Sequence, residues 1–395
     1  MAEAFDWGLL EPAGVAGLVA SDDRVLEAMV EVERAYLAAW CELLGVDSHG
    51  ELSMEAIDKD ALLRSSRQAG VPVVGLVHEL RRHGGERVHQ GMTSQDVLDT
   101  ALMIVSKDAL GGARAQLESA GRSLRDLALE HRATPTIART LTQEAEPTTL
   151  GAAISVWLDA VTSALEALDS VSYPVQLGGA VGDGNAMLRR SGDPAAVATL
   201  RSRVAGQLGL ADPGRSWHTE RSAVLAVARS AASVCTTGGR IGRDLGLLAR
   251  DGVITPGHGG GSSSMPHKHN PVDAVLLVAN GLRVGGALAV LQSAALSYDA
   301  RPAGEWHAEW QAWRETLRLA AESASLLDHA SSDLVVHAGR AAARNAQASS
   351  EAVSDTGHRA ADQSNTIAAG HMVDAAVERF DGLASVGGAV AGGTR

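Results

Sequence analysis

Cysteine is almost absent from this chain of 395 residues, and aromatic side chains make up only 3% of it. The two cysteines, Cys41 and Cys235, both lie in apolar segments with a helical pattern. Two cysteines are too few for a disulfide framework or for a cysteine-based metal site. Lysine is also scarce, since it occurs only at positions 59, 107 and 268. The composition therefore excludes a disulfide scaffold and makes each lysine conspicuous.

Basic residues are in the minority. The chain has 34 Lys and Arg against 47 Asp and Glu, which gives a formal net charge of −13. A protein that binds the phosphate backbone of nucleic acids needs a basic face, so we expect no nucleic-acid partner. A small anionic substrate stays compatible with this charge, because a single pocket can be positive in an acidic protein.

Long uninterrupted apolar runs are missing as well. The most apolar helical stretch, around 150–168, contains Asp159 and Glu166. No segment reaches the ~18 apolar residues that a membrane-spanning helix requires. The first residues, MAEAFDWGLLEPAG, are acidic and lack the basic and apolar regions of a signal peptide. We therefore expect a soluble cytoplasmic protein that does not contact a membrane.

The pattern that is present is helical almost throughout. Asp22 and Asp23 are expected to cap a helix over 25–44 that ends at Gly45. Longer helices are expected at about 94–131, 147–171 and 219–250. Alternating Val, Ile and Thr segments are scarce, so the sequence predicts an all-α fold.

Two segments repeat apolar or small residues at alternating spacings of three and four. Such seams indicate long helices that pack along their length. Both segments are apolar on more than one face, which suggests association between subunits. The first seam is Val224, Val227, Ala231, Val234, Gly238, Ile241, Leu245 and Leu248, and the second is Val272, Val275, Ala279, Leu282, Gly286, Ala289, Ser293 and Leu296.

The most informative segment is TPGHGGGSSSMPHKHNPVD, residues 255–273. Its glycines favour a flexible loop, and Asn270 with Pro271 can open the next helix. A helix N-terminus attracts anions, and Lys268 adds a positive charge beside it. We interpret the loop as a lid over a carboxylate-bearing substrate, with an ordinary surface linker as the alternative. It is no Walker-type loop, and the two histidines beside Lys268, with no acidic cluster nearby, do not predict a metal site.

Three segments resemble regions of the fumarase/aspartase superfamily. GSSSMPHKHNP resembles the signature GSSxMPxKxNP, VHQGMTSQDVLDTA (88–101) resembles the second region, and ARTLTQEAEPTTLG (138–151) resembles the first helical region after it. The resemblance covers roughly 20–330. It implies a homotetramer with active sites shared between subunits, and an all-α, fumarase/aspartase-like fold whose long central helix bundle is flanked by two small helical domains. The expected divisions are an N-terminal helical domain at 1–92, the bundle at 93–330 with a catalytic loop at 255–271, and a small C-terminal helical region at 331–395 with a frayed tail after Asp381.

Within the superfamily, TSQD and RPAGEWHAEW (301–310) resemble the bacterial 3-carboxy-cis,cis-muconate cycloisomerases. That resemblance implies conversion of 3-carboxy-cis,cis-muconate to 4-carboxymuconolactone in protocatechuate breakdown, with a small polycarboxylate substrate and no metal or organic cofactor. One alternative is a C–N or C–O lyase of the same superfamily that releases fumarate from a succinyl-type substrate. Another is a helical scaffold without catalysis, which the intact Ser262, Lys268 and Asn270 argue against.

The resemblance also implies roles for individual residues. Ser262 is the expected proton carrier, while Lys268 and Asn270 stabilise the carboxylate onto which the carbanion charge spreads. His89 matches a histidine beside the site, where a catalytic and a structural role both stay open. The expected substrate-binding residues are Thr93, Ser94, Gln95, Gln143, Glu144, Asn270 and Arg301, although one residue of 93–95 is expected only to cap a helix.

One departure from the superfamily pattern matters for the choice of substrate. Many lyases of the superfamily carry a histidine in a THxQPA-type segment that acts on the leaving group, whereas this chain has Leu141 at that position. Loss of the histidine disfavours adenylosuccinate-type and argininosuccinate-type lyases. It fits a cycloisomerase, because a carboxylate oxygen needs no protonation. Glu144 is harder to explain, since its carboxylate would repel a tricarboxylate unless it is protonated or paired.

Overall fold

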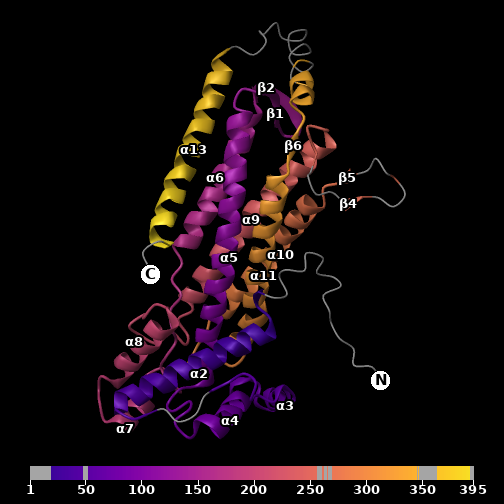
Figure 1. Ribbon diagram of the computed structural model, residues 1–395. Helices are drawn as coiled ribbons and strands as arrows, with labels where there is room; N and C mark the ends of the chain where they lie inside the picture. The colour runs from indigo at the N-terminus through magenta and orange to yellow at the C-terminus, as the bar shows by residue number, and fades with distance from the viewer. Residues whose placement is uncertain are drawn as a thin grey trace. The chain divides into compact units, whose positions relative to one another are not determined.

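The computed structural model describes residues 19–47, 52–255, 260–261, 265, 269–344, 346 and 363–391 (Figure 1). Its contacts divide the chain into two compact units, which are treated separately below. Unit 1 comprises Met1–Leu110, Val171–Arg229 and Ala287–Arg318, and unit 2 comprises Gly111–Ser170, Ser230–Gly286 and Leu319–Arg395. Ser262 and Lys268 lie outside the described residues.

The described chain is mostly helical, which confirms the all-α fold. The helices are α2 (Asp22–Leu44), α3 (Lys59–Ala69), α4 (Val73–Gly84), α5 (Ser94–Glu130), α6 (Leu150–Asp169), α7 (Asn185–Ser191), α8 (Ala196–Leu208), α9 (Ser222–Arg250), α10 (Val272–Ala294), α11 (Glu305–Ser332) and α13 (Gln363–Ala391). Strands form only two-stranded antiparallel pairs: β1 (Pro135–Thr140) with β2 (Gln143–Thr149), β3 (Ile254–Thr255) with β6 (Val335–Val336), and β4 (Gly260–Gly261) with β5 (His269–Asn270).

The first described long helix, α2, has the expected extent but a different cap. Ser21 is the N-cap, and its hydroxyl accepts a hydrogen bond from the N–H of Arg24 at 3.1 Å. Asp22 and Asp23 lie in the first turn instead, where their charges interact favourably with the helix dipole. Gly45 ends the helix in a left-handed conformation with φ of 65°, as the sequence predicted.

The resemblance marked 138–151 as a helical region, and that prediction is wrong for most of the segment. Most of it belongs to the hairpin of β1 and β2, and α6 begins only at Leu150. Pro147 cannot donate a helical hydrogen bond, and the many threonines of this segment suit extended backbone. The two turn residues, Leu141 and Thr142, have positive φ angles of 48° and 73°. The hairpin therefore presents an exposed two-residue tip.

The two predicted seams differ in their surroundings. In the first seam, on α9, the residues from Val224 to Leu245 are buried. In the second seam, Val275 and Leu282 of α10 are 62% and 67% exposed and Leu296, just beyond the end of α10, is 80% exposed, while the opposite face of α10 is buried. Within unit 2, α9 and α10 approach closely through glycines, since a Cβ atom on Gly239 would lie 3.2 Å from the backbone of Gly281. The second seam is therefore an apolar face that the described residues leave largely exposed.

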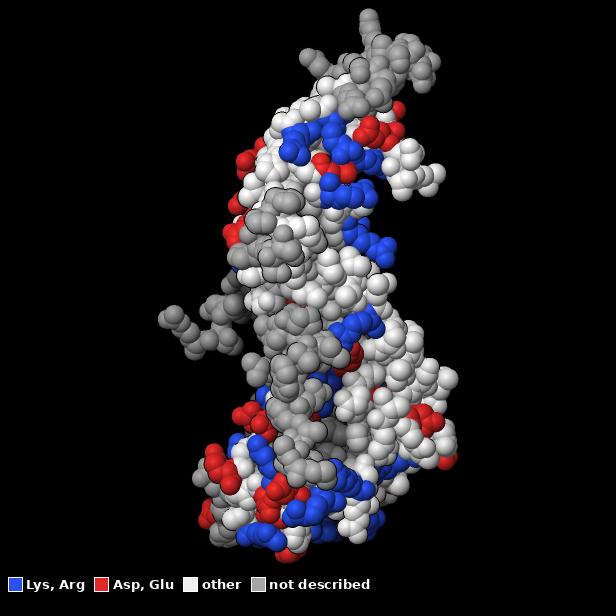
Figure 2. Space-filling model, turned by 90° about the vertical axis from the view of Figure 1, so that its right-hand side faces the viewer, with Lys and Arg blue, Asp and Glu red and all other residues white. Residues whose placement is uncertain are grey.

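Two described helices, α6 and α10, are long and apolar enough to span a membrane by length and composition. The relevant window of α6 is 61% buried inside the protein and that of α10 is 28% buried. Core helices of soluble proteins pass the same test, so the finding carries little weight. On the face shown in Figure 2, charged side chains gather in separate groups with uncharged surface between them.

The C-terminal helix α13 packs along α6 within unit 2. Phe380 is buried and lies against Gly121 of α5, where a Cβ atom would approach the ring to 2.3 Å. The helix continues to Ala391, so its backbone includes most of the Gly-rich segment that we expected to fray. Alanines 384, 389 and 391 in that segment are good helix formers.

Candidate active site

The predicted site residues fall into two groups. His89, Thr93, Ser94, Gln95 and Arg301 belong to unit 1. Unit 2 contains Gln143, Glu144 and Asn270. Each group is described within its own unit.

In unit 1, the start of α5 is held by the buried carboxylate of Asp96. Its bond to the N–H of Thr93 is the helix-capping contact of a side chain near the start of a helix. Gly179 must be a glycine here, because its φ is 71° and a Cβ atom would lie 2.7 Å from the Gly91 carbonyl oxygen. The carboxylate accepts five hydrogen bonds of 2.8–3.1 Å, from the N–H groups of Thr93, Gly178 and Gly179 and from the side chains of Gln176 and His218.

Gln95 is fully buried. Its side-chain amide donates to the Asp99 carboxylate at 3.3 Å and to the His218 carbonyl oxygen at 2.8 Å. These bonds give Gln95 a supporting role inside unit 1. Ser94, the first residue of α5, is partly exposed beside it. Thr93 and Ser94 are therefore better placed than Gln95 to face a ligand.

A second buried charge group lies one helical turn further along α5. The guanidinium of Arg221 donates to Asp99 at 2.7 Å and to Glu309 at 3.0 Å, and all three side chains are at most 3% exposed. The indole N–H of Trp306 also donates to Asp99, at 2.9 Å. Burial disfavours the charged guanidinium, but the two carboxylates outweigh that effect and raise the pKa of Arg221 above its ordinary value. The group therefore ties α5, α9 and α11 together inside unit 1.

The structure brings Arg301 to the start of α5 within unit 1. Its guanidinium donates to the hydroxyl of Thr93 and lies 5.6 Å from the centre of the Trp306 ring. Arg301 is exposed, whereas Thr93 is nearly buried. One cation and two hydroxyl-bearing residues, Thr93 and Ser94, thus gather at a helix N-terminus, which suits a carboxylate ligand.

His89 is held in an unusual backbone conformation, with a φ of 63°. Its Nδ1 lies 2.6 Å from the carboxylate of Glu33, which is fully buried. The next residue is fixed as well, because Tyr36 and Trp40 both donate to the carbonyl oxygen of Gln90. With the proton assigned to Nδ1, the Nε2 atom of the neutral ring is left as a proton acceptor.

Asp96 was expected from the sequence as a possible cap of α5, but several other residues of these networks were not predicted: Glu33, His218, Arg221 and Glu309. Among these four, a signal existed for Glu33, because it interrupts the apolar stripe of α2 between Val30 and Leu37. A charged residue in an apolar stripe requires a partner, and the partner is His89.

In unit 2, the predicted residues lie on the β1–β2 hairpin. Leu141 at its tip is 96% exposed. Gln143 is exposed, and the described contact of its amide is a 3.3 Å bond to the hydroxyl of Thr142. Glu144 pairs with Arg139 at 3.3 Å and with Arg344 at 3.4 Å. The carboxylate of Glu144 is therefore paired, which removes the objection that it would repel an anionic substrate.

Asn270 lies at the C-terminal side of the predicted lid. It pairs in β5 with Gly260 of β4, immediately before α10 begins at Val272. On the N-terminal side of the lid, the hydroxyl of Thr255 is 2.7 Å from Nε2 of His337. Both ends of the loop 255–271 are thus anchored in unit 2.

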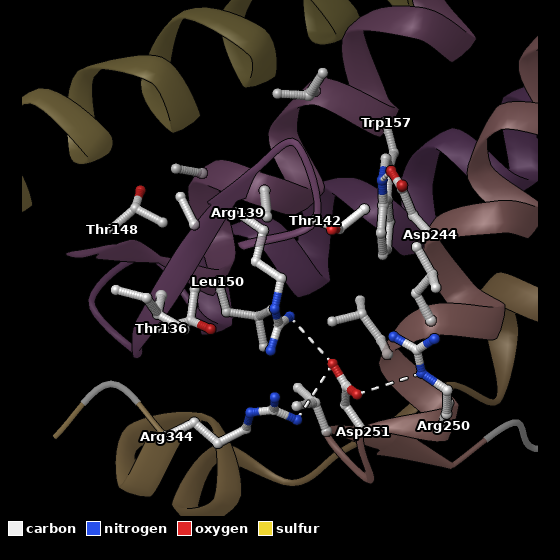
Figure 3. Close-up of a pocket in the computed structure, with 18 of the residues that line it drawn as sticks. Thr136, Arg139, Thr142, Thr148, Leu150, Trp157, Asp244, Arg250, Asp251 and Arg344 are labelled. Atoms are coloured by element: carbon white, nitrogen blue, oxygen red, sulfur yellow. Dashed lines mark hydrogen bonds and ion pairs between the residues drawn. The ribbon is translucent and has the colours of Figure 1, made fainter. Parts of the chain in front are cut away.

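Beside the hairpin, unit 2 contains a cavity of about 600 Å³ (Figure 3). Arg139, Arg250 and Arg344 point toward Asp251 at 3.1, 3.6 and 3.2 Å. Trp157 forms part of the wall and donates its indole N–H to Asp244 at 2.8 Å. Across the described residues, no group of three or more His, Cys, Asp or Glu side chains is arranged to hold a metal ion.

Comparisons with known proteins agree with the fold. A sequence profile of a family described as lyase matches residues 22–286. Nitrosuccinate lyase from Streptomyces davaonensis is 38% identical over 365 residues, which cover 86% of this chain and 77% of the relative. The 3-carboxy-cis,cis-muconate cycloisomerase of Pseudomonas putida is 34% identical over 314 residues, which cover 74% and 72%. The solved structure of the 3-carboxy-cis,cis-muconate lactonizing enzyme from Pseudomonas putida matches with a TM-score of 0.81 at 24% identity, over 95% of this chain and 100% of that chain.

The structural match supports the fold alone, whereas the sequence matches establish descent over most of the chain. The chain therefore belongs to the lyase family of the fumarase/aspartase superfamily and is an enzyme of that superfamily.

Proposed function

We propose that this enzyme adds or expels a stable anion across the carbon–carbon bond next to a carboxylate of a small polycarboxylate. The observation that carries the proposal is Leu141 at the exposed hairpin tip, where many lyases of the superfamily have a histidine. An aliphatic side chain cannot protonate a leaving group. The group that leaves or attacks must therefore be stable as an anion without acid catalysis.

The first candidate reaction is cycloisomerisation of 3-carboxy-cis,cis-muconate to 4-carboxymuconolactone. A carboxylate oxygen of the substrate attacks the diene and forms the new C–O bond. The electron pair of the double bond moves to the carbon next to another carboxylate, and that carbon takes a proton from Ser262. Lys268 and Asn270 hold the carboxylate that bears the developing charge. Thr93, Ser94 and Arg301, which lie together in unit 1, hold a further carboxylate.

The second candidate is elimination from nitrosuccinate, which the 38% identity to nitrosuccinate lyase favours. Ser262 removes a proton from the carbon next to one carboxylate. The electron pair forms the double bond, and the C–N bond breaks to release nitrite, which leaves fumarate as the product. Nitrite is a stable anion, so this reaction also needs no acid at position 141.

The quaternary structure belongs to the same proposal. The exposed apolar seam of α10 fits a helix of a second copy, and we place it in the interface of a cytoplasmic homotetramer. Gln143 stands near an exposed tip rather than inside unit 2, as expected for a residue that completes the site of another subunit. The proposed enzyme needs neither a metal nor an organic cofactor.

The experiment compares both substrates on one preparation without added metal. Lactonisation removes one double bond from the conjugated diene of carboxymuconate, so its ultraviolet absorbance falls. Elimination from nitrosuccinate is followed by the appearance of fumarate and nitrite. We expect turnover of one substrate to exceed the other by at least tenfold and to disappear in Ser262→Ala. A folded oligomer that acts on neither substrate, or a Ser262→Ala variant with unchanged rates, would refute the proposal.

A further inference from the structure

The cavity of Figure 3, here named the arginine pocket, is not part of the proposed reaction. Its walls come from the β1–β2 hairpin, α6, α9 and the segment around Arg344, all in unit 2. Its volume of about 600 Å³ falls within the range of small-molecule sites, which is about 300–1,000 Å³. Neither Ser94, Arg301 nor Asn270 lines it.

The arginine pocket has more hydrogen-bond donors than its own carboxylates can use. Arg139, Arg250 and Arg344 surround one carboxylate, Asp251, which is only 12% exposed. Each guanidinium carries five N–H donors, whereas a carboxylate offers about four acceptor positions. Glu144, which does not line the pocket, accepts from two of the three arginines. The remaining donors are therefore available to a further anion.

The other walls of the arginine pocket are mostly apolar, although they include three threonines and the ion pair of Arg240 with Asp244. Trp157 of α6 lies behind the wall, since it is only 2% exposed, and donates its indole N–H to Asp244 (Figure 3). A free inorganic anion would gain nothing from these walls. A ligand with a flat apolar body would cover them and so gain hydrophobic contact. The aliphatic residues of the lining are Ile137, Leu150, Val156, Leu247, Leu248, Val253 and Met372.

We propose that the arginine pocket binds a small carboxylate with a flat aromatic or unsaturated body. The carboxylate pairs with the guanidinium groups of Arg139, Arg250 and Arg344, and the body lies against the exposed aliphatic lining side chains, which are Val156, Leu247 and Met372. A bidentate guanidinium–carboxylate contact provides the orientation. The binding step does not depend on the proposed reaction.

The position of the pocket adds a regulatory consequence, which does rest on the proposed function. Arg139 precedes the hairpin tip and Gln143, while Arg250 and Asp251 close α9 just before the loop 255–271. A bound carboxylate that competes for these arginines shifts the hairpin and the base of the loop together. Occupancy therefore changes the catalytic rate without occupying the substrate site.

Calorimetric titration of the full-length oligomer with benzoate tests the binding step. Benzamide, which has the same body without the charge, is the control ligand and should bind at least tenfold more weakly. Val156→Glu places a negative charge in the wall, and Arg250→Gln removes a donor; each should weaken benzoate binding at least tenfold. Arg243→Gln removes the same charge from the same helix outside the pocket lining and should bind benzoate as the wild type does.

The outcomes are separable from those of the reaction assay. Ser262→Ala should bind benzoate normally, because the proposed proton carrier does not belong to the pocket. The proposal fails if the wild type does not bind benzoate at millimolar concentration. It also fails if the pocket variants, folded by circular dichroism and unchanged in melting temperature, bind benzoate as tightly as Arg243→Gln does. If benzoate binds but the catalytic rate does not change, the regulatory consequence is refuted, while the proposed binding site stands.

Discussion

The two units support their predicted site residues in opposite ways. In unit 1, Thr93 and Ser94 are held by fully buried charges, with Asp96 and Asp99 as the anchors. In unit 2, the hairpin that carries Gln143 and Glu144 is held by ion pairs whose arginines are about one third exposed. The predicted site residues of unit 1 thus depend on desolvated polar groups, whereas those of unit 2 depend on solvent-screened ion pairs.

The difference in burial has a physical consequence. Removing one partner of a buried ion pair leaves an uncompensated charge and costs about 3–5 kcal/mol. An exposed pair contributes about 0–1 kcal/mol. Unit 1 is therefore expected to hold its ligand groups rigidly, whereas the hairpin of unit 2 can shift at little cost. The four predictions below test that contrast.

The largest expected effect is on folding. Arg221→Met leaves Asp99 and Glu309 buried without their cation, so unfolding free energy should fall by about 3–5 kcal/mol. Chemical denaturation of the oligomer at fixed protein concentration measures this. The triple variant Arg221→Met, Asp99→Asn, Glu309→Gln removes all three charges and should recover much of the loss. A loss below about 1 kcal/mol in the single variant would contradict the buried-charge account.

The next effect is at the start of α5. Asp96→Asn keeps the shape of the side chain but turns one acceptor oxygen into a donor, which then opposes the N–H group of either Gly178, bonded to Oδ1, or Gly179, bonded to Oδ2. We expect a loss of about 1–3 kcal/mol of stability, the cost of an unsatisfied buried group. Substrate KM should rise because Thr93 loses its position. Asp108→Asn, in an exposed part of the same helix, is the control and should change neither quantity by a comparable amount.

A third variant separates chemistry from structure. Glu33→Gln can still hydrogen-bond His89 but no longer favours a proton on Nδ1. If His89 takes part in proton transfer, kcat should fall by about 10²-fold with KM little changed. Glu31→Gln, two residues away on the partly exposed side of α2, is the control. Nitrogen NMR shifts of the His89 ring should report a change of tautomer; an unchanged ring and unchanged kcat would leave Glu33 a purely structural residue.

The smallest effect is expected on the hairpin. Arg344→Gln leaves Glu144 with Arg139 as a partner, so stability should change by less than about 1 kcal/mol. Because Glu144 is then less neutralised, KM for a polyanionic substrate should rise a few-fold while kcat stays the same. Arg344→Lys should restore KM. A loss of stability as large as that of Arg221→Met would contradict the proposed difference between the buried ion pairs of unit 1 and the exposed ion pairs of unit 2.

The sequence predicted the all-α fold and the long helices well, because seams of apolar residues report directly on helix packing. The first seam, including Val227 and Val234, is buried as expected. We did not predict the hairpin, because the resemblance indicated a helical region at 138–151. The local signals, Pro147 and the threonines, favour extended backbone instead. The cap of α2 moved by one residue, a distance that side-chain chemistry alone does not resolve when Ser21, Asp22 and Asp23 follow one another.

The supporting residues of the site were less predictable. Asp96 is separated by 82 residues from Gly178 and by 122 from His218, so their contacts depend on tertiary packing. Arg301 and Thr93 are 208 residues apart, and only the resemblance suggested that they share a site. The pairing of Glu144 was likewise undecided in the sequence, because one of its partners, Arg344, lies 200 residues away.

The chain has only two phenylalanines, and one of them, Phe380, determines how α13 packs. Phe380 enters a notch at Gly121, where any side chain would collide with the ring, so a single aromatic fixes the register of the last helix along unit 2. A shift of α13 by one turn would move the ring out of the notch and against a residue with a Cβ atom. The helix therefore packs in a single register, although its other residues are mostly small.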